Sequence, residues 1–147
     1  MIGKVIFKGI YFNEFVDDNN ELLSFPVSFT MKVSFQGNSF QGTRIDDETK
    51  SVINEPVRVK GFLEGDFISF TIDYPCNYYI DPDTGQTILL EDEPHPGVVY
   101  EGFFDKTIQT YKGEYQVVIE ELRKGVFQDD FDVEAIVGNW EMEKINN

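Results

Sequence analysis

The side chains that could do chemistry in this 147-residue chain are few, and none stands in a recognisable catalytic motif. His95 is the only histidine, and no serine or cysteine nucleophile is placed beside it, so a nucleophile–histidine triad has no support. Cys76 is the only cysteine and lies near Asp73 and Asp81, whose charges raise a thiol pKa and disfavour a reactive thiolate. We therefore predict no catalytic residues and no cofactor, and an enzyme is the least favoured class of function.

A possible metal site is the segment Asp81-Pro82-Asp83-Thr84-Gly85. Glycine stands where the third acid of an EF-hand loop is required, so the match to that motif fails. The same residues are typical of a type I turn followed by a glycine bulge, and we assign no metal ligands here. A diffuse divalent-cation site among the acidic loops stays open, because calcium accepts irregular shells of oxygen ligands.

Arg44 is the residue whose type fits its expected position least well. Strand alternation places it on an inward, otherwise apolar face, where a guanidinium needs partners. Asp46, two residues on, or a tyrosine hydroxyl would supply them. Two interpretations stay open: a pocket for a small molecule, or an internal ion pair in a filled core. The candidate ligand-binding residues are Arg44, Asp46, Tyr11, Tyr100, Tyr115 and Trp140.

The elements that must position these side chains are predicted to be β-strands. From Phe25 to Gln36, apolar and polar residues alternate without a break, which indicates a strand with one buried face. Gly37-Asn38 then predicts a two-residue turn with positive φ at both positions. The register that follows pairs Phe35 with Phe40, Val33 with Gly42, Met31 with Arg44 and Phe29 with Asp46. A second hairpin is predicted with its turn at Glu64-Gly65.

A repeated glycine pattern indicates how the strands assemble. The pattern large–x–Gly–x–large, once with arginine in the last place, occurs around Gly9, Gly42, Gly61, Gly102, Gly113 and Gly138. Inward glycines relieve crowding where strands bend to close a small barrel, although chance enrichment is an alternative. With further strands over 4–15, 98–104, 111–119 and 133–144, eight strands are predicted. The expected fold is all-β: one domain, residues 1–147, forming an antiparallel eight-stranded up-and-down (meander) barrel.

Charge is the strongest feature of the composition, with 27 acidic against 12 basic residues and a net charge of −15. Such a surface repels phosphates and anionic headgroups, so we expect no nucleic-acid and no membrane partner. In a meander, the long connections 16–24, 47–55, 75–96 and 121–132 share one end. Most of the acids fall in or beside them, which predicts an acidic, loop-rich mouth. The single cysteine and the absence of a signal-peptide pattern at residue 1 favour the cytoplasm.

The strand order and glycine steps resemble the calycin-like barrels, which include lipocalins, fatty-acid-binding proteins and avidins. The resemblance is closest to small uncharacterised bacterial barrels of that type. It rests on Phe40-Gln41-Gly42-Thr43-Arg44-Ile45-Asp46-Asp47, Gly61-Phe62-Leu63-Glu64-Gly65-Asp66-Phe67-Ile68-Ser69-Phe70 with Tyr74-Pro75, and Tyr100-Glu101-Gly102-Phe103-Phe104-Asp105. The Gly-x-Trp motif of the first lipocalin strand is Gly9-Ile10-Tyr11 here, while Gly138-Asn139-Trp140 lies on the last strand. No ligand therefore transfers by resemblance.

The expected function is the binding of a small molecule inside the barrel at the acidic mouth, where the charge favours a neutral or cationic ligand. The alternative is a protein-interaction or structural module whose barrel is filled and ligand-free. For that role the second hairpin places Phe62 and Phe67 outward, where they offer the contact of a homodimer.

Overall fold

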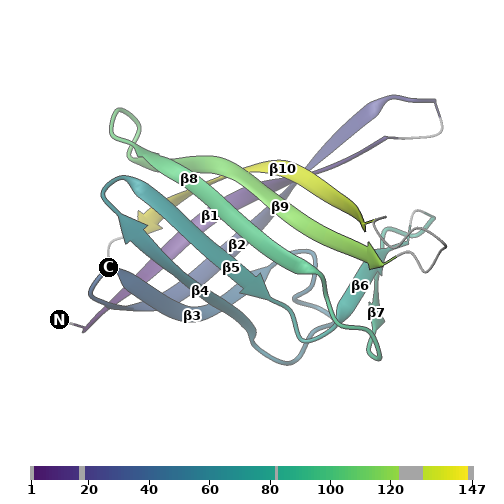
Figure 1. Cartoon of the computed structure of the whole chain (residues 1–147), viewed down its shortest axis with the longest axis horizontal. Helices are drawn as coiled ribbons and strands as arrows, with labels where there is room; N and C mark the ends of the chain where they lie inside the picture. Colours follow the sequence, from purple (N-terminus) through teal and green to yellow (C-terminus); the bar gives the residue numbers. More distant parts are fainter. Residues whose placement is uncertain (1, 17–18, 82, 123–130, 146–147) are drawn as a thin grey trace.

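The computed structural model describes residues 2–16, 19–81, 83–122 and 131–145. Eight strands form a closed antiparallel barrel, and two short strands form a separate hairpin (Figure 1). The barrel strands are β1 (Ile2–Val16), β2 (Leu22–Gln36), β3 (Ser39–Asp46), β4 (Val57–Glu64), β5 (Phe67–Asp73), β8 (Gly97–Asp105), β9 (Thr110–Leu122) and β10 (Phe131–Ile145). The hairpin strands are β6 (Asn77–Ile80) and β7 (Thr87–Leu90).

The barrel is a meander, as predicted. Its strands follow the order β1-β10-β9-β8-β5-β4-β3-β2, and every neighbouring pair is antiparallel. Successive barrel strands are therefore neighbours, and β10 closes the barrel by pairing with β1. The sequence pattern does not predict the β6–β7 hairpin, which lies within the connection between β5 and β8. The described part of the chain contains no helix that is long and apolar enough to cross a membrane.

The predicted register of the β2–β3 hairpin is confirmed at all four pairs: Phe35 with Phe40, Val33 with Gly42, Met31 with Arg44, and Phe29 with Asp46. The turn itself differs from the prediction. Only Gly37 has a positive φ (+62°), which is the pattern of a type II′ turn. The second turn is formed by Gly65-Asp66, one residue later than predicted, because Gly65 supplies the positive φ (+60°).

The inward glycines have the geometric cause that the repeat predicts. A Cβ on any of the six would overlap a neighbouring strand or a core side chain. At Gly42 and Gly113 the overlapped atoms belong to the backbone of the neighbouring strand, so neither position can accommodate a side chain unless that backbone moves. The glycines therefore set how closely adjacent strands approach, and with that how tightly the barrel closes.

The two ends of the barrel differ. The turns after β2, β4 and β8 are short and define the tight-turn end, near which both marked ends of the chain lie (Figure 1). The other end, the loop end, carries residues 47–56 and the β6–β7 hairpin. The connection predicted over 16–24 is shorter than expected, because β1 runs to Val16 and β2 starts at Leu22. The resulting hairpin extends beyond the barrel (Figure 1).

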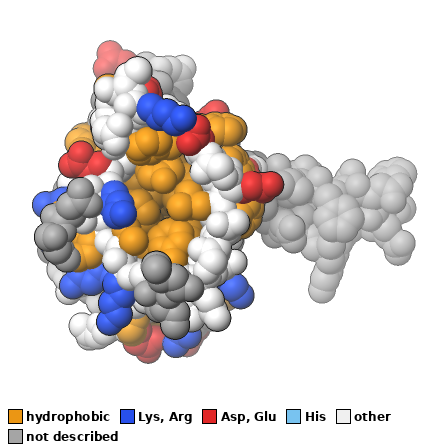
Figure 2. Space-filling view, turned by 90° about the vertical axis from the view of Figure 1, so that its left-hand side faces the viewer, with side chains coloured by type: hydrophobic (Ala, Val, Ile, Leu, Met, Phe, Trp, Pro, Cys, Tyr) orange, Lys and Arg blue, Asp and Glu red, His pale blue; other side chains and the backbone are white. Residues whose placement is uncertain are grey.

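Aromatic rings fill the barrel. Phe70 stacks on Tyr100 at 4.9 Å between centroids, and Tyr100 stacks in turn on Tyr115 at 5.2 Å. Apolar side chains also occupy the opening at the tight-turn end (Figure 2), where Phe35 and Tyr111 pack against the core while partly exposed. The interior is therefore a packed core for most of its length, and its buried polar side chains gather toward the loop end.

Candidate functional site

The site begins at the C-terminal end of β3, where strand alternation directs two charged residues into the barrel. Arg44 and Asp46 are 2% and 1% exposed, so both charges are removed from solvent. Tyr11 comes from β1 and Tyr100 from β8, on opposite sides of β3 in the closed barrel. The predicted inward position of Arg44 is therefore confirmed, and its surroundings include residues of β1, β2, β3 and β8.

Aromatic rings surround the Arg44 guanidinium. Its central carbon lies 4.4 Å from the ring centroid of Phe29 and 4.9 Å from those of Tyr11 and Tyr100. Such contacts stabilise a desolvated cation through the negative face of the ring. Nη2 also donates a hydrogen bond of 2.9 Å to the Tyr100 hydroxyl. The rings lie over the guanidinium, so hydrogen-bond acceptors reach it only along its edges.

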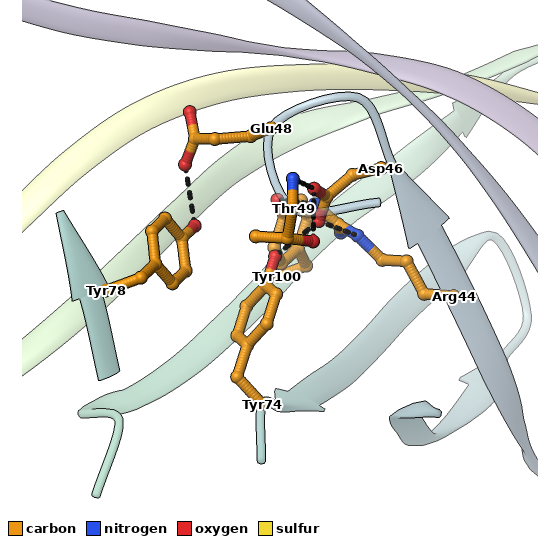
Figure 3. Close-up of polar contacts among 7 residues, drawn as sticks. All are labelled: Arg44, Asp46, Glu48, Thr49, Tyr74, Tyr78 and Tyr100. Carbon is orange, nitrogen blue, oxygen red and sulfur yellow. Dashed lines mark hydrogen bonds and ion pairs between the residues drawn. The ribbon is translucent and has the colours of Figure 1, made fainter. Parts of the chain in front are cut away.

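Asp46 is held by three donors and faces Arg44 (Figure 3). Its Oδ1 accepts the backbone N–H and the hydroxyl of Thr49, both at 2.8 Å. Its Oδ2 accepts the Tyr74 hydroxyl at 2.6 Å and lies 3.7 Å from Nε of Arg44, an ion pair too long for a hydrogen bond. Asp46 therefore balances the buried cation and fixes the first turn of the 47–56 connection.

Glu48 ties this layer to the β6–β7 hairpin. Its two carboxylate oxygens accept the Tyr78 hydroxyl at 2.6 Å, as Figure 3 shows, and the Asn13 amide at 2.8 Å. Its backbone carbonyl accepts the Thr87 hydroxyl at 2.5 Å. Because Tyr78 lies on β6 and Thr87 on β7, both hairpin strands are fastened over the loop end through one residue.

His95 closes the same region from the segment before β8. Its ring lies 4.6 Å from the Tyr74 ring and 5.3 Å from the Tyr78 ring, and Nδ1 is 2.7 Å from the carbonyl of Pro96. The flanking prolines suggest an exposed loop, but the histidine is half-buried between these rings. Burial lowers the pKa of His95 below its ordinary value of 6.5.

The pKa values of the other groups show how far solvent is excluded. Burial, with a smaller contribution from Asp46, raises the pKa of Glu48 above its ordinary value, against the hydrogen bonds from Tyr78 and Asn13. Burial lowers the pKa of Arg44. The electrostatic effects of Tyr100, Tyr74 and Asp46 outweigh this and leave the pKa well above its ordinary value. Arg44 is therefore a permanent internal cation, and Glu48 is a carboxyl group that burial makes harder to ionise.

The six predicted candidates separate into two layers. Arg44, Asp46, Tyr11 and Tyr100 surround the guanidinium as described above. Tyr115 lies against Tyr11 and Tyr100 but donates its hydroxyl to the Phe12 carbonyl at 2.7 Å. Trp140 donates its indole N–H to the Glu114 carbonyl at 3.0 Å. The polar atoms of Tyr115 and Trp140 therefore serve the barrel wall rather than the Arg44 cluster.

Several residues of the cluster are not predicted from the sequence. Thr49 has a signal, because an aspartate side chain commonly accepts the backbone N–H of the residue three positions on, as Asp46 does from Thr49. Tyr74 follows the end of a predicted strand, which marks it as a residue of the mouth. Glu48, Tyr78 and His95 have no such signal, since their contacts depend on how the β6–β7 hairpin folds back.

Three buried polar atoms of this cluster have no hydrogen-bond partner among the described residues. They are Nε and Nη1 of Arg44 and the hydroxyl of Tyr11. The Tyr11 hydroxyl lies close enough to Glu48 to lower the pKa of that carboxyl, but it makes no hydrogen bond of good geometry to any described residue. Buried donors without partners cost on the order of 1–3 kcal/mol each, so this arrangement favours an oxygen-bearing molecule beside them.

The neighbouring grooves clarify access. One of about 620 Å³ lies against β2–β5, is lined largely by outward side chains such as Gln41, Lys60 and Thr71, and does not include Arg44. Another, of about 490 Å³, lies between β3, the start of β4 and the 47–56 connection. Arg44 and Thr49 belong to its lining, but both side chains are almost fully buried, so the groove lies beside the cluster on the outer side of β3.

The sequence also singles out Cys76 and the segment from Asp81 to Gly85 as candidates for chemistry. Cys76 is buried, and burial followed by the charges of Glu91 and Glu55 raises its pKa; the direction agrees with the sequence prediction although the acids differ. Asp81 accepts the N–H groups of Asp83 and Gly85, and Gly85 has a positive φ (+71°), so the described residues of this segment form a turn. Within the described residues, no three histidine, cysteine, aspartate or glutamate side chains form a group that could hold a metal ion.

Comparison with protein-family models, with curated proteins and with solved structures finds no match to this chain. The class of molecule is therefore defined by the fold and the cluster alone: a closed eight-stranded barrel with a buried arginine–aspartate pair beneath the loops at one end.

Proposed function

We propose that this chain is a calycin-like, cytoplasmic protein that binds a small molecule at the loop end of its barrel. The observation that carries the proposal is the set of three unpartnered polar atoms on Arg44 and Tyr11. Buried polar groups in folded proteins are nearly always hydrogen-bonded, and exceptions concentrate where a ligand or water completes the set. The proposal also includes the resemblance of this chain to small bacterial barrels, which rests on the sequence pattern.

The chemistry of the open atoms defines the ligand class. Nε and Nη1 of Arg44 are donors only, and a tyrosine hydroxyl donates as well as accepts. The complementary group is an oxygen acceptor such as the carbonyl of an amide, a ketone or a lactone. Asp46 and Glu48 lie beside these atoms, and the chain carries 15 net negative charges, so an anionic carboxylate or phosphate is disfavoured. The proposed ligand is therefore a neutral molecule that presents a carbonyl oxygen.

The packed aromatic core limits where this molecule lies. Phe70, Tyr100 and Tyr115 stack through the middle of the barrel and occupy the space that a deep ligand would need. The carbonyl group would instead lie at the edge of the guanidinium, reached from the 47–56 connection or from beneath the β6–β7 hairpin. Opening the hairpin requires release of Tyr78 and Thr87 from Glu48.

Native mass spectrometry of the protein purified without denaturant tests the proposal. The wild type is expected to carry a bound small molecule. Tyr11→Phe removes the open hydroxyl while keeping the ring, and it is expected to retain less of that molecule. Tyr111→Phe, which changes a partly exposed tyrosine at the opposite end of the barrel, is the matched control and is expected to behave as the wild type.

Two results would contradict this function. One is a wild-type mass that matches the bare chain in every preparation, which would favour the alternative of a structural module with a filled barrel. The other is an adduct that Tyr11→Phe retains as well as the control, because the molecule would then lie away from the Arg44 cluster.

A further inference from the structure

Three phenylalanine rings form a continuous apolar surface on the outside of the barrel. The rings of Phe62 and Phe67 lie 6.1 Å apart, and those of Phe67 and Phe103 lie 5.3 Å apart. Phe62 is 41% exposed and Phe103 is 63% exposed. Contiguous aromatic surface of this kind is unusual on a monomer and is typical of an interface.

A row of outward side chains crosses four strands through this surface. On adjacent strands Glu64 pairs with Phe67, Phe67 with Phe103, and Phe103 with Lys112. The row thus reads acid, aromatic, aromatic, base across β4, β5, β8 and β9. Three strand spacings of about 4.8 Å separate Glu64 from Lys112, so the two charges lie about 14 Å apart and cannot pair within one chain.

We propose that this surface is the interface of a homodimer in which a second copy packs against β5 and β8. A two-fold axis that lies in the interface, parallel to the strands and midway between β5 and β8, reverses the order of the row in the second copy. Phe67 of each copy then faces Phe103 of the other, and Glu64 faces Lys112. The interface is self-complementary, as an isologous dimer requires.

Charge argues for a second copy at this position. Two molecules with a net charge of −15 repel each other, and the repulsion is smallest where the surface is locally balanced. The row of Glu64, Phe67, Phe103 and Lys112 carries one acid and one base, and the arrangement makes two Glu64–Lys112 contacts across the interface. The next outward row is Phe62, Ser69, Glu101 and Glu114, and the same axis places Phe62 opposite Glu114 of the second copy. Lys60, two residues before Phe62 on β4, lies diagonally opposite Glu114 of the second copy in the same arrangement.

Sedimentation equilibrium over a range of protein concentrations tests the dimer. The wild type is expected to form a concentration-dependent dimer. Phe103→Ser is expected to raise the dissociation constant about 30-fold, in the range of an interface hot spot. Ile45→Ser, which removes an equally exposed apolar side chain from the outer face of β3, is the matched control and is expected to leave the constant unchanged.

A charge exchange tests the arrangement itself. Glu64→Lys and Lys112→Glu are each expected to weaken the dimer at least about tenfold, because each places like charges opposite one another twice. The double variant restores both pairs and is expected to recover wild-type association. No intrachain pair explains such a recovery, since the two residues are three strand spacings apart, with β5 and β8 between them. A wild type that stays monomeric at every concentration overturns the proposal, and so does a dimer that the double variant fails to restore.

Discussion

At the scale of single residues, Arg44 determines the character of the site. Arg44 is 2% exposed, and its buried charge is stabilised by the rings that cover its faces and by Asp46, which lies 3.7 Å from Nε. Removing two charges from water is costly, and their attraction offsets this cost only when hydrogen bonds satisfy the remaining atoms. Asp46 is satisfied in this way by Thr49 and Tyr74, whereas Arg44 is satisfied only at Nη2. The imbalance lies on the arginine, which is why a ligand is proposed there.

Replacing Arg44 with methionine is expected to lower the free energy of unfolding by about 3–5 kcal/mol, because Asp46 is left buried without its counter-charge. Adding Asp46→Asn to that variant removes the stranded charge and is expected to recover part of the loss. Urea unfolding of both variants measures this difference. Arg58→Met, at an exposed position on β4, is the control and is expected to change stability by less than about 0.5 kcal/mol. A double variant less stable than Arg44→Met would contradict the buried pair.

The raised pKa of Glu48 predicts how the stability of the fold depends on pH. Its pKa is raised in the folded protein, so the folded state binds the proton more tightly than the unfolded state does. Stability therefore falls as the pH rises from the ordinary value of 4.5 through the raised pKa, and the loss is complete above it. Glu48→Gln is expected to gain stability relative to the wild type over this window. Urea unfolding at a series of pH values measures the gain, with Glu143→Gln, at an exposed position on β10 away from the proposed interface, as the control for loss of one surface charge. A constant difference across the window would contradict the prediction.

Sequence reasoning finds the centre of the site but not its rim. Arg44 and Asp46 are predictable because strict alternation from Gly37 carries them to the inward face. Tyr78 and His95 are not, because their position depends on a hairpin with no periodic pattern and on ring stacking across long loops. Periodicity reports which face a residue occupies, whereas contacts between loops depend on packing that no local pattern encodes.

At the scale of elements, the inward glycines carry the clearest prediction. Gly113→Ala on β9 is expected to destabilise the barrel by at least about 1–3 kcal/mol, because the new Cβ overlaps backbone atoms of β8. Gly97→Ala on β8, where a Cβ meets nothing within 4 Å, is the matched control and is expected to be neutral or slightly stabilising. Thermal unfolding compares the two. Equal midpoints would show that the glycines do not set the spacing of the strands.

Most elements follow from alternation and turn chemistry, and the failures are instructive. The β6–β7 hairpin is missed because its strands are four residues long and each β7 residue is partly buried, so no alternation appears. The turn at Gly65-Asp66 is misplaced by one residue because Glu64-Gly65 and Gly65-Asp66 both contain the glycine that the turn requires. The two alternatives differ only in whether the glycine takes the first or the second position of the turn.

At the scale of the whole molecule, the charge of −15 opposes the compact state. Added salt screens this repulsion, with a Debye length of about 10 Å at 0.1 M. The thermal midpoint is therefore expected to rise when sodium chloride increases from about 20 to 500 mM. A flat or falling midpoint would show that surface repulsion does not limit stability.

Calcium chloride at matched ionic strength tests the acidic loops for a cation site. A thermal midpoint above that in sodium chloride marks a specific site, and coincident curves exclude one.

The pairing of β1 with β10 has a consequence for how the chain folds. Ile6 pairs with Ile145, so the barrel closes only through contact between residues far apart in sequence, while the other pairings join successive barrel strands. Loop-closure entropy delays such non-local contacts, and barrels rich in them fold in milliseconds to seconds. Until β10 docks, the edges of β1 and β9 present unpaired backbone groups to other chains. During synthesis this interval lasts until residues 131–145 have left the ribosome, which makes the emerging chain the form most exposed to aggregation.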